Sequence, residues 1–246
     1  PGRQQVKEMI ASWAREWVDE GNRPDQGAPI LIPELRAMLA TCQSLHPADL
    51  RDGALLSLGW SMLCRRSELA DRTIKDVVVV DDGVMVYFAR SKTDQAARGR
   101  ESFAPADPDP LLDPVRYMRA WLEWLAGRGI KDGALFRALT VAGTLQSRAS
   151  ATKRGDFLTG DAIGAIVKRR AARAGLPNWR EIRAHGLRSG PATELAAAGA
   201  DEDDIAWQGR WKKGSRVVRE RYIRPVMDRR ENPMRRLAEH RRKQRE

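Results

Sequence analysis

The stretch that decides the fold is residues 185–222, HGLRSGPATELAAAGADEDDIAWQGRWKKGSRVVRERY. It places a histidine, an arginine three residues later, a tryptophan and a tyrosine in one C-terminal segment. Its second half is rich in cations, with seven Lys or Arg and one acid between Ile205 and Pro225. Cations can neutralise a phosphate, and a tyrosine phenol can form a covalent ester with phosphorus. The segment is therefore a candidate for attack on a phosphodiester.

The composition of the whole chain is consistent with this reading. The 246 residues are 42% hydrophobic and 31% charged, which suits one large domain or one domain with an appendage. The net charge of +11 favours a polyanionic partner, most often nucleic acid, over a basic surface that only keeps the chain dispersed. Two cysteines in apolar surroundings, Cys42 and Cys64, indicate a reducing cytoplasm and not a zinc site. We see no apolar run of membrane-spanning length and no secretory signal.

Hydrophobic periodicity and capping residues predict an α+β fold, mostly helical, with a small three-stranded antiparallel sheet inserted early. The predicted helices cover residues 6–18, 33–42, 47–62, 114–127, 160–174, 187–198 and 201–207, and further helices carry Tyr222 and Met234. The predicted strands cover residues 76–80, 84–90 and 101–104, with a turn at Asp81-Asp82-Gly83. Pro191 lies inside the 187–198 helix, so we expect that helix to begin near Ser189 or Gly190.

Five short motifs, taken in order, resemble the catalytic domain of the tyrosine recombinases, the phage integrase family. They are LCRRSEL with Arg65, SKT with Lys92, HGLR with His185 and Arg188, GRW with Trp211, and RYIRP with Tyr222. The resemblance extends over roughly residues 28–227. The chain departs from the family pattern at Leu63-Cys64, where a glycine usually precedes the first arginine. Trp211 and Tyr222 are also slightly further apart than usual, which leaves open whether Tyr222 acts in cis or in trans.

The resemblance implies a role for each residue at a phosphate. Arg65 and Arg188 would clamp the non-bridging oxygens, with Glu68 holding Arg65 in place. His185 would donate a hydrogen bond to the phosphate and assist proton transfer, and Trp211 would offer its indole N–H.

The resemblance also implies the course of the reaction. Tyr222 would attack phosphorus to form a 3′-phosphotyrosyl bond, and Lys92 would protonate the departing 5′ oxygen. The hydroxyl of a partner strand then reverses the step. Bond energy is conserved, so the reaction needs no ATP, metal or other cofactor, and the sequence contains no pattern that resembles a metal site.

The family's DNA-bound assembly gives further expectations. Residues 1–27 would be the end of an upstream helical DNA-binding domain with a linker, although the 6–18 helix could instead pack on the main core. Residues 28–227 would form the catalytic domain. The basic tail 228–246 would dock on a neighbouring protomer through Met234, Leu237 and Ala238. We expect weak DNA binding without the upstream part.

Partners follow from the same resemblance: double-stranded DNA with paired inverted half-sites, and further copies of the chain as a tetramer on synapsed DNA, with a monomer when free. The location implied is the nucleoid in the bacterial cytoplasm. Eight further cations are candidates for contacts to DNA phosphates: Arg169, Arg170, Arg173, Arg180, Arg183, Arg210, Lys212 and Lys213.

Three other functions stay open at this point. The chain could be a DNA-binding or architectural protein on the same scaffold without catalysis. It could be a type IB topoisomerase, which shares the tyrosine chemistry but relaxes generic supercoiled DNA. It could also be a basic RNA-binding module, which would form no covalent adduct.

Overall fold

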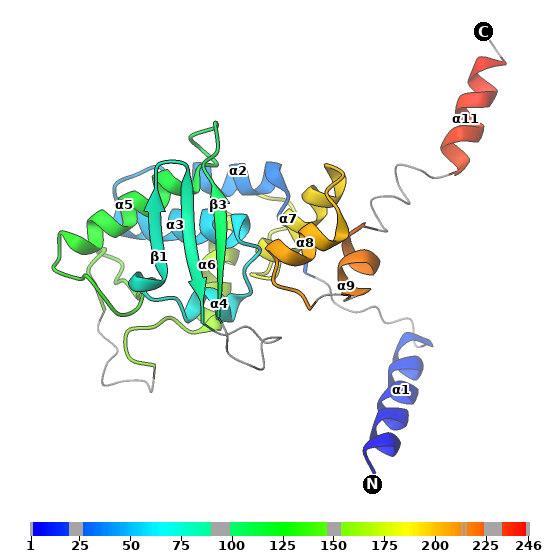
Figure 1. Ribbon diagram of the computed structural model, residues 1–246, viewed down its shortest axis with the longest axis horizontal. Helices are drawn as coiled ribbons and strands as arrows, with labels where there is room; N and C mark the ends of the chain where they lie inside the picture. The colour runs from blue at the N-terminus through cyan, green and yellow to red at the C-terminus, as the bar shows by residue number, and fades with distance from the viewer. Residues whose placement is uncertain are drawn as a thin grey trace.

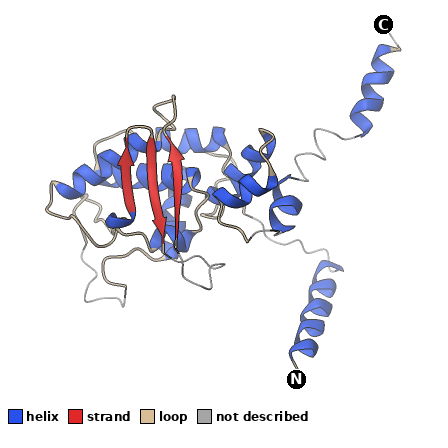
Figure 2. Ribbon diagram, viewed as in Figure 1, coloured by secondary structure: helices blue, strands red, loops and turns tan. Residues whose placement is uncertain are grey.

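The computed structural model describes residues 2–19, 27–89, 99–146, 154–212, 214, 216–223 and 233–244. Its body is a set of helices with one small sheet lying over them, as Figures 1 and 2 show. The strands β1 (Val77–Val80), β2 (Gly83–Phe88) and β3 (Arg100–Pro105) pair antiparallel in the order β1-β2-β3. The predicted fold class is therefore confirmed, and the strand boundaries differ from the prediction by one or two residues.

Buried and exposed side chains alternate along the strands, so one face of the sheet is buried. Val84, Val86 and Phe88 of β2 point inward and are buried, whereas Tyr87 on the same strand and Phe103 on β3 are exposed. Successive side chains of a strand point to opposite faces, so one face can join the core while the other stays open. The inner face packs on α5 (Pro114–Ala126), whose N-terminus is capped by Asp113.

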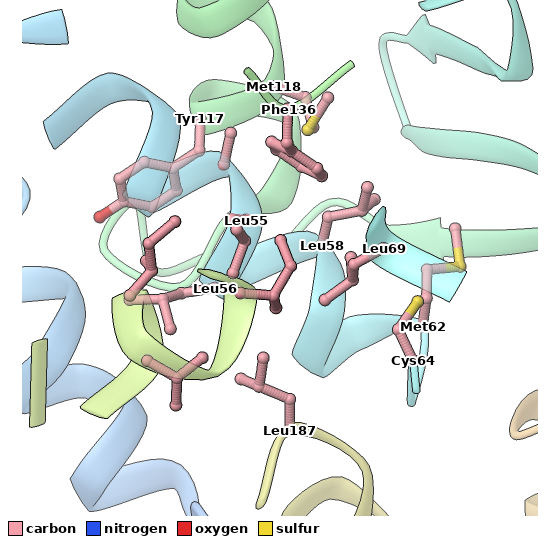
Figure 3. Close-up of a cluster of buried hydrophobic side chains, with 14 of the residues drawn as sticks. Leu55, Leu56, Leu58, Met62, Cys64, Leu69, Tyr117, Met118, Phe136 and Leu187 are labelled. Carbon is pink, nitrogen blue, oxygen red and sulfur yellow. The ribbon is translucent and has the colours of Figure 1, made fainter. Parts of the chain in front are cut away.

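The central helix of the main core is α3 (Pro47–Ser61), in which Arg51 to Gly59 are all buried. It contacts α5, α2 (Ile32–Ala40) and α6 (Gly160–Arg173). Figure 3 shows Leu55, Leu56 and Leu58 of α3 among apolar side chains from several elements. The free cysteines Cys42 and Cys64 are both buried, and burial raises the pKa of each thiol to about 11.

A second, smaller core lies beyond the β3 edge of the sheet (Figure 1). It joins α7 (Gly186–Ala197), α8 (Glu202–Gln208), the short helix α9 (Arg216–Val218) and η2 (Arg219–Ile223), a single π-helical turn. Its buried members are Leu63, Ala192, Ile205, Ala206, Val218 and Tyr222. The predicted nucleophile Tyr222 is thus packed into a local core that also holds the chain just before Arg65.

The start of α7 differs from the prediction. The helix begins at Gly186 with His185 as its N-cap residue, and Pro191 lies inside it. An internal proline costs a helix about 3 kcal/mol, but residues 186–192 are all buried here, and tertiary burial outweighs that local cost. Gly190 permits the packing, because a Cβ there would lie 1.8 Å from the carbonyl oxygen of Ile30.

Two helices lie at the ends of the chain, α1 (Arg3–Asp19) and α11 (Pro233–Lys243), both as predicted. Figure 1 shows both standing away from the body. Trp13 of α1 is 77% exposed. The two interpretations of this helix, as the end of an upstream domain or as part of the main core, both stay predictions. None of the helices within the described ranges combines the length and the apolar character that a bilayer crossing requires.

Candidate active site

Arg65 lies at a break between two helices and not at the end of α3, where the sequence had suggested it. The chain leaves α3 at Met62, turns at Leu63 with a φ of 49°, and enters α4 (Arg66–Ala70) with Arg65 as N-cap residue. Left-handed backbone is uncommon for residues other than glycine. Leu63 thus adopts a backbone conformation that glycine would adopt without steric cost.

Glu68 holds Arg65 in two ways. Its Oε1 accepts a hydrogen bond from Nη1 of Arg65 at 2.6 Å, and its Oε2 accepts one from the backbone N–H of Arg65 at 2.9 Å. Glu68 is buried, whereas Arg65 keeps part of its side chain exposed. The predicted reach of three residues is therefore observed, and it leaves the guanidinium of Arg65 open on one side.

Arg188 is the most unusual side chain of the site, because only 2% of it is exposed and, among the residues that the structure describes, it forms no ion pair with an acid. Its Nη1 donates to the carbonyl oxygen of Leu63 at 2.6 Å, and its guanidinium carbon lies 3.6 Å from the ring centre of Trp211. Its Nη2 is buried and has no hydrogen-bond partner in the structure. Buried polar groups are nearly always paired, so this nitrogen marks a place for an acceptor.

Trp211 and Tyr222 complete the cluster. Their ring centres lie 5.6 Å apart with the planes tilted by 58°. Tyr222 belongs to the π-helical turn η2, a conformation that is rare and often found at functional sites. The Trp211 ring also folds back over Gly209, where a Cβ would lie 1.8 Å from the indole, so only glycine fits there.

The charges of the site shift the pKa values of its titratable groups. Burial and the charge of Arg65 lower the pKa of Arg188 to about 9, although Glu68 opposes this shift. Burial, Arg188 and Arg221 lower the pKa of His185, which keeps an exposed edge. Burial raises the pKa of Tyr222, although nearby guanidinium groups oppose it. The site therefore carries excess positive charge, a neutral imidazole and a protonated phenol at neutral pH.

A hollow of about 450 Å³ opens beside His185. It lies between the start of α4, one face of α6 and the segment that leads into α7, and its cations are Arg66, Lys168 and Arg183. Arg66 pairs with Asp161 at 2.9 Å, but both side chains are largely exposed. His185 lines this basic hollow and also lies close enough to Arg188 and Arg65 for their charges to lower its pKa, so the hollow adjoins the candidate site.

The cations predicted to contact DNA divide into three groups. Arg170 and Arg210 are buried and bound to acidic side chains, and their contact with DNA phosphates stays a prediction. Arg169 and Arg173 are exposed, but they pair with Asp52 and Asp49 and line a different hollow from the one at His185. The exposed cations whose role stays a prediction are Arg180, Arg183 and Lys212.

Lys92 and Lys213, two further predicted site residues, lie outside the described residues. Two cations at the site were not singled out from the sequence. Lys168 is one, and helical spacing could have identified it, because Asp161, Gly164 and Lys168 share a face of α6 that Arg170 does not. Arg221 is the other, and its charge acts on both His185 and Tyr222.

Comparison with known proteins gives one family. The model of the phage integrase family matches residues 31–229. An integrase/recombinase xerD homolog from Selenomonas ruminantium is 31% identical over 192 residues, which cover 78% of this chain and 53% of that protein. This chain thus spans about half the length of that curated relative.

Solved structures show the same fold at low sequence identity. The crystal structure of XerA recombinase superposes with a TM-score of 0.58 at 18% identity, covering 82% of this chain and 61% of that one. The XerH site-specific recombinase, in a post-cleavage complex with a palindromic difH substrate, gives 0.56 at 18% identity, with 82% and 52% covered. With the family model and the curated relative, these matches show that the chain belongs to the phage integrase family, the tyrosine recombinases.

Proposed function

We propose that this chain is a site-specific DNA recombinase that cleaves and rejoins strands through a 3′-phosphotyrosyl bond at Tyr222. Family membership supports strand exchange as the reaction class. The observation that carries the proposal furthest is Arg188, a buried guanidinium with an unpartnered nitrogen beside Trp211 and Tyr222. A phosphodiester in contact with Arg188 would supply the acceptor that this nitrogen lacks.

The charge balance of the cluster suits the transition state. Arg65, Arg188 and Arg210 bring three positive charges around the single carboxylate of Glu68. The phosphodiester carries one negative charge, and the pentacoordinate transition state carries more. Preorganised cations in a site that excludes water stabilise such developing charge strongly. The excess charge therefore favours the transition state over the ground state.

The proton and the bonds can be followed through the step. His185, neutral because its pKa is lowered, accepts the proton of the Tyr222 phenol. The bond between the Tyr222 oxygen and phosphorus forms while the bond from phosphorus to the 5′ oxygen breaks. That oxygen takes a proton, in this proposal from Lys92. Attack of a 5′-hydroxyl from the partner strand reverses every change, so strand exchange consumes no energy source.

DNA would approach over the hollow beside His185. Its cations, Arg66, Lys168 and Arg183, carry no sequence information and would hold the phosphate backbone. Each phosphate that such a cation neutralises makes the affinity for DNA fall more steeply as the salt concentration rises. We expect the substitution Lys168→Gln to reduce the salt dependence of DNA binding, whereas Arg173→Gln, in the other hollow, leaves it unchanged.

The domain and assembly expectations are also part of the proposal. Residues 28–227 would act as the catalytic domain, residues 1–27 as the end of an upstream clamp, and residues 228–246 as a tail that docks on a neighbour. The exposed Met234 and Leu237 of α11 support the docking of the tail. A native gel of the DNA complex tests this, because removal of residues 228–246 should leave binding of one copy but abolish higher assemblies.

The test of the chemistry is covalent trapping. The protein is incubated with a library of nicked duplexes with randomised half-sites, and SDS-stable protein–DNA bands are sought. Tyr222→Phe should lose the band, whereas Tyr117→Phe, at another buried tyrosine that lies in α5, should keep it. Binding of selected duplexes without any band would favour the non-catalytic scaffold. A band together with relaxation of generic supercoiled plasmid would favour a topoisomerase.

A further inference from the structure

Arg210 is a predicted contact to DNA phosphates, yet only 3% of it is exposed. Its Nη2 donates to Oε2 of Glu68 at 2.9 Å and to the carbonyl oxygen of Met62 at 2.9 Å. Its Nη1 donates to the carbonyl oxygen of Gln208 at 3.1 Å, and its guanidinium carbon lies 3.9 Å from the ring centre of Phe88. One side chain therefore joins the end of α8 to the sheet, to the end of α3 and to Glu68.

The backbone of Arg210 is as unusual as its side chain. Its φ is 56°, and among the non-glycine residues of the described ranges only Leu63 shares this left-handed conformation. Such a conformation persists where the surroundings impose it, and it clusters at functional sites. Here it sends the Arg210 guanidinium inward to Glu68, while the next residue, Trp211, turns its ring toward Arg188 and Tyr222.

Glu68 is shared between two arginines. Its carboxylate receives Arg65 through the backbone N–H and Nη1, and Arg210 through Nη2. A single buried carboxylate thus fixes a residue predicted to clamp the phosphate and, through Arg210, the turn that presents Trp211. If Arg210 were absent, Glu68 could rotate or accept a proton, and Arg65 would lose its fixed position.

We propose that Arg210 is a positioning residue for strand cleavage, which holds Glu68 so that Arg65 and Trp211 are presented together to the phosphate. The inference rests on the proposed function, because it says how Arg65 and Trp211 are held in position for the proposed reaction. Arg210 itself contacts neither the nucleophile nor the phosphate in this account. It acts through the Glu68 carboxylate and through the turn at Gly209.

The chain offers a matched control in Arg72. This arginine is also buried, its Nε donates to the backbone oxygen of Glu68 at 2.8 Å, and its guanidinium stacks on the same Phe88 ring at 4.8 Å. Its Nη1 donates to the carbonyl oxygen of Tyr87, so it ties α4 to the sheet. Arg72 does not touch the Glu68 carboxylate. Loss of Arg72 should therefore remove a comparable buried contact without disturbing Arg65.

The protonation of Glu68 gives a readout that a merely structural role would not move. Burial acts to raise the pKa of Glu68, but the charge and hydrogen bond of Arg210, together with those of Arg65, lower it overall. The other charged or titratable groups close to it are Arg72, Arg188 and Cys64. Arg210→Met should therefore raise the pKa of Glu68.

The experiment compares Arg210→Met, Arg210→Lys and Arg72→Met with the unchanged chain. On a nicked duplex selected for adduct formation, Arg210→Met should slow the single-turnover rate by about 10²-fold, since misplacement of a catalytic group by about 1 Å has effects of this size. DNA affinity should stay unchanged, and Arg210→Lys should recover part of the rate. Arg72→Met, although it lowers stability, should keep the rate. NMR titration of the Glu68 carboxyl group should show the raised pKa only in Arg210→Met.

Equal rates for Arg210→Met and Arg72→Met, or an unchanged Glu68 titration in Arg210→Met, would overturn the inference. These outcomes differ from failure of the proposed function, in which the unchanged chain itself gives no adduct that depends on Tyr222. The titration does not depend on cleavage. It therefore decides whether Arg210 controls Glu68 even in that case.

Discussion

Two arginines are buried to the same extent, with 2% of each exposed, yet their surroundings are opposite. Arg170, on α6, uses all three guanidinium nitrogens: they donate to Asp49, to Asp52 and to the carbonyl oxygens of Thr41 and Ala48. Arg188, on α7, donates to one carbonyl oxygen and leaves Nη2 without a partner. Arg170 therefore lies in a closed cluster, in which each guanidinium nitrogen has an acceptor. Arg188 lies in an open cluster, in which one guanidinium nitrogen has no acceptor among the described residues.

The pKa values of the two groups differ in direction for the same reason. Burial acts to lower the pKa of Arg170, but Asp52 and Asp49 raise it above its ordinary value. Around Arg188, burial and the charge of Arg65 lower the pKa to about 9. A folded chain can hold a poorly compensated buried cation only at a cost in stability. That cost, beside Trp211 and Tyr222, indicates a role in binding an anion.

The largest effect that separates the two clusters should be on stability. Arg170→Met removes a buried cation that binds both Asp49 and Asp52, and removal of one member of such a cluster costs about 3–5 kcal/mol of unfolding free energy. Urea denaturation measures this. The exposed Arg128, which lies over Trp124, is the control, and Arg128→Met should cost less than about 1 kcal/mol. A loss as small as that of the control would show that the closed cluster does not stabilise the fold.

The next effect should be on the rate. In the proposed reaction Arg188 donates to the transition state, so Arg188→Met should slow phosphotyrosyl formation by about 10²–10³-fold. Its unfolding free energy should fall much less than that of Arg170→Met, because Arg170 pairs with two buried carboxylates, whereas the ion pairs of the described residues include none to Arg188. Single-turnover trapping and urea denaturation on the same preparations measure both quantities. Equal destabilisation by the two substitutions would remove the distinction between a closed and an open cluster.

A smaller effect concerns the turn that supplies the single acceptor of Arg188. Leu63 is buried and has a φ of 49°, so Leu63→Ala loses packing while keeping the unfavourable backbone. Glycine has no Cβ and adopts a left-handed backbone without steric cost. Leu63→Gly should therefore be less destabilising than Leu63→Ala by about 1 kcal/mol. At most positions an alanine variant is more stable than a glycine variant, and we expect the opposite order of stability at this position. Thermal unfolding of both variants checks it, and the ordinary order would show that the turn is not strained.

The smallest effect should be a shift in a titration. Burial lowers the pKa of His185 below its ordinary 6.5, and Arg221 is one of the charges that lower it further, so Arg221→Gln should raise that pKa. The acid limb of the cleavage profile lies below pH 6.5, where His185 becomes protonated, and it should move upward with the substitution. NMR titration of the His185 ring measures the shift. A downward shift would contradict the electrostatic account of the site.

The sequence predicted the elements of the fold well because their signals are local. Pro47 and Asp113 mark helix starts, Asp81-Asp82-Gly83 marks a turn, and all three lie where they were expected. The start of α7 was mispredicted for a reason that is not local. Pro191 argues against a helix there, but burial against the segment around Ile30 decides the outcome.

The candidate site, too, has a part that the sequence predicts and a part that depends on contacts between distant residues. The order of the motifs identified Arg65, Glu68, His185, Arg188, Trp211 and Tyr222, and the structure brings these residues together. Burial of single cations could not be predicted, because Arg170 and Arg210 occur in the same basic runs as exposed neighbours. What distinguishes them is an acid far away in the chain, Asp52 for one and Glu68 for the other.

The most direct test of the central claim is to identify the residue that carries the DNA. The adduct trapped on a nicked duplex is digested with nuclease and protease, and mass spectrometry locates the remaining nucleotide. We predict a phosphodeoxynucleotide on Tyr222, joined through its 3′ phosphate. A modification on Tyr87, Tyr117 or a serine, or a DNA complex with no covalent bond at all, would contradict the account.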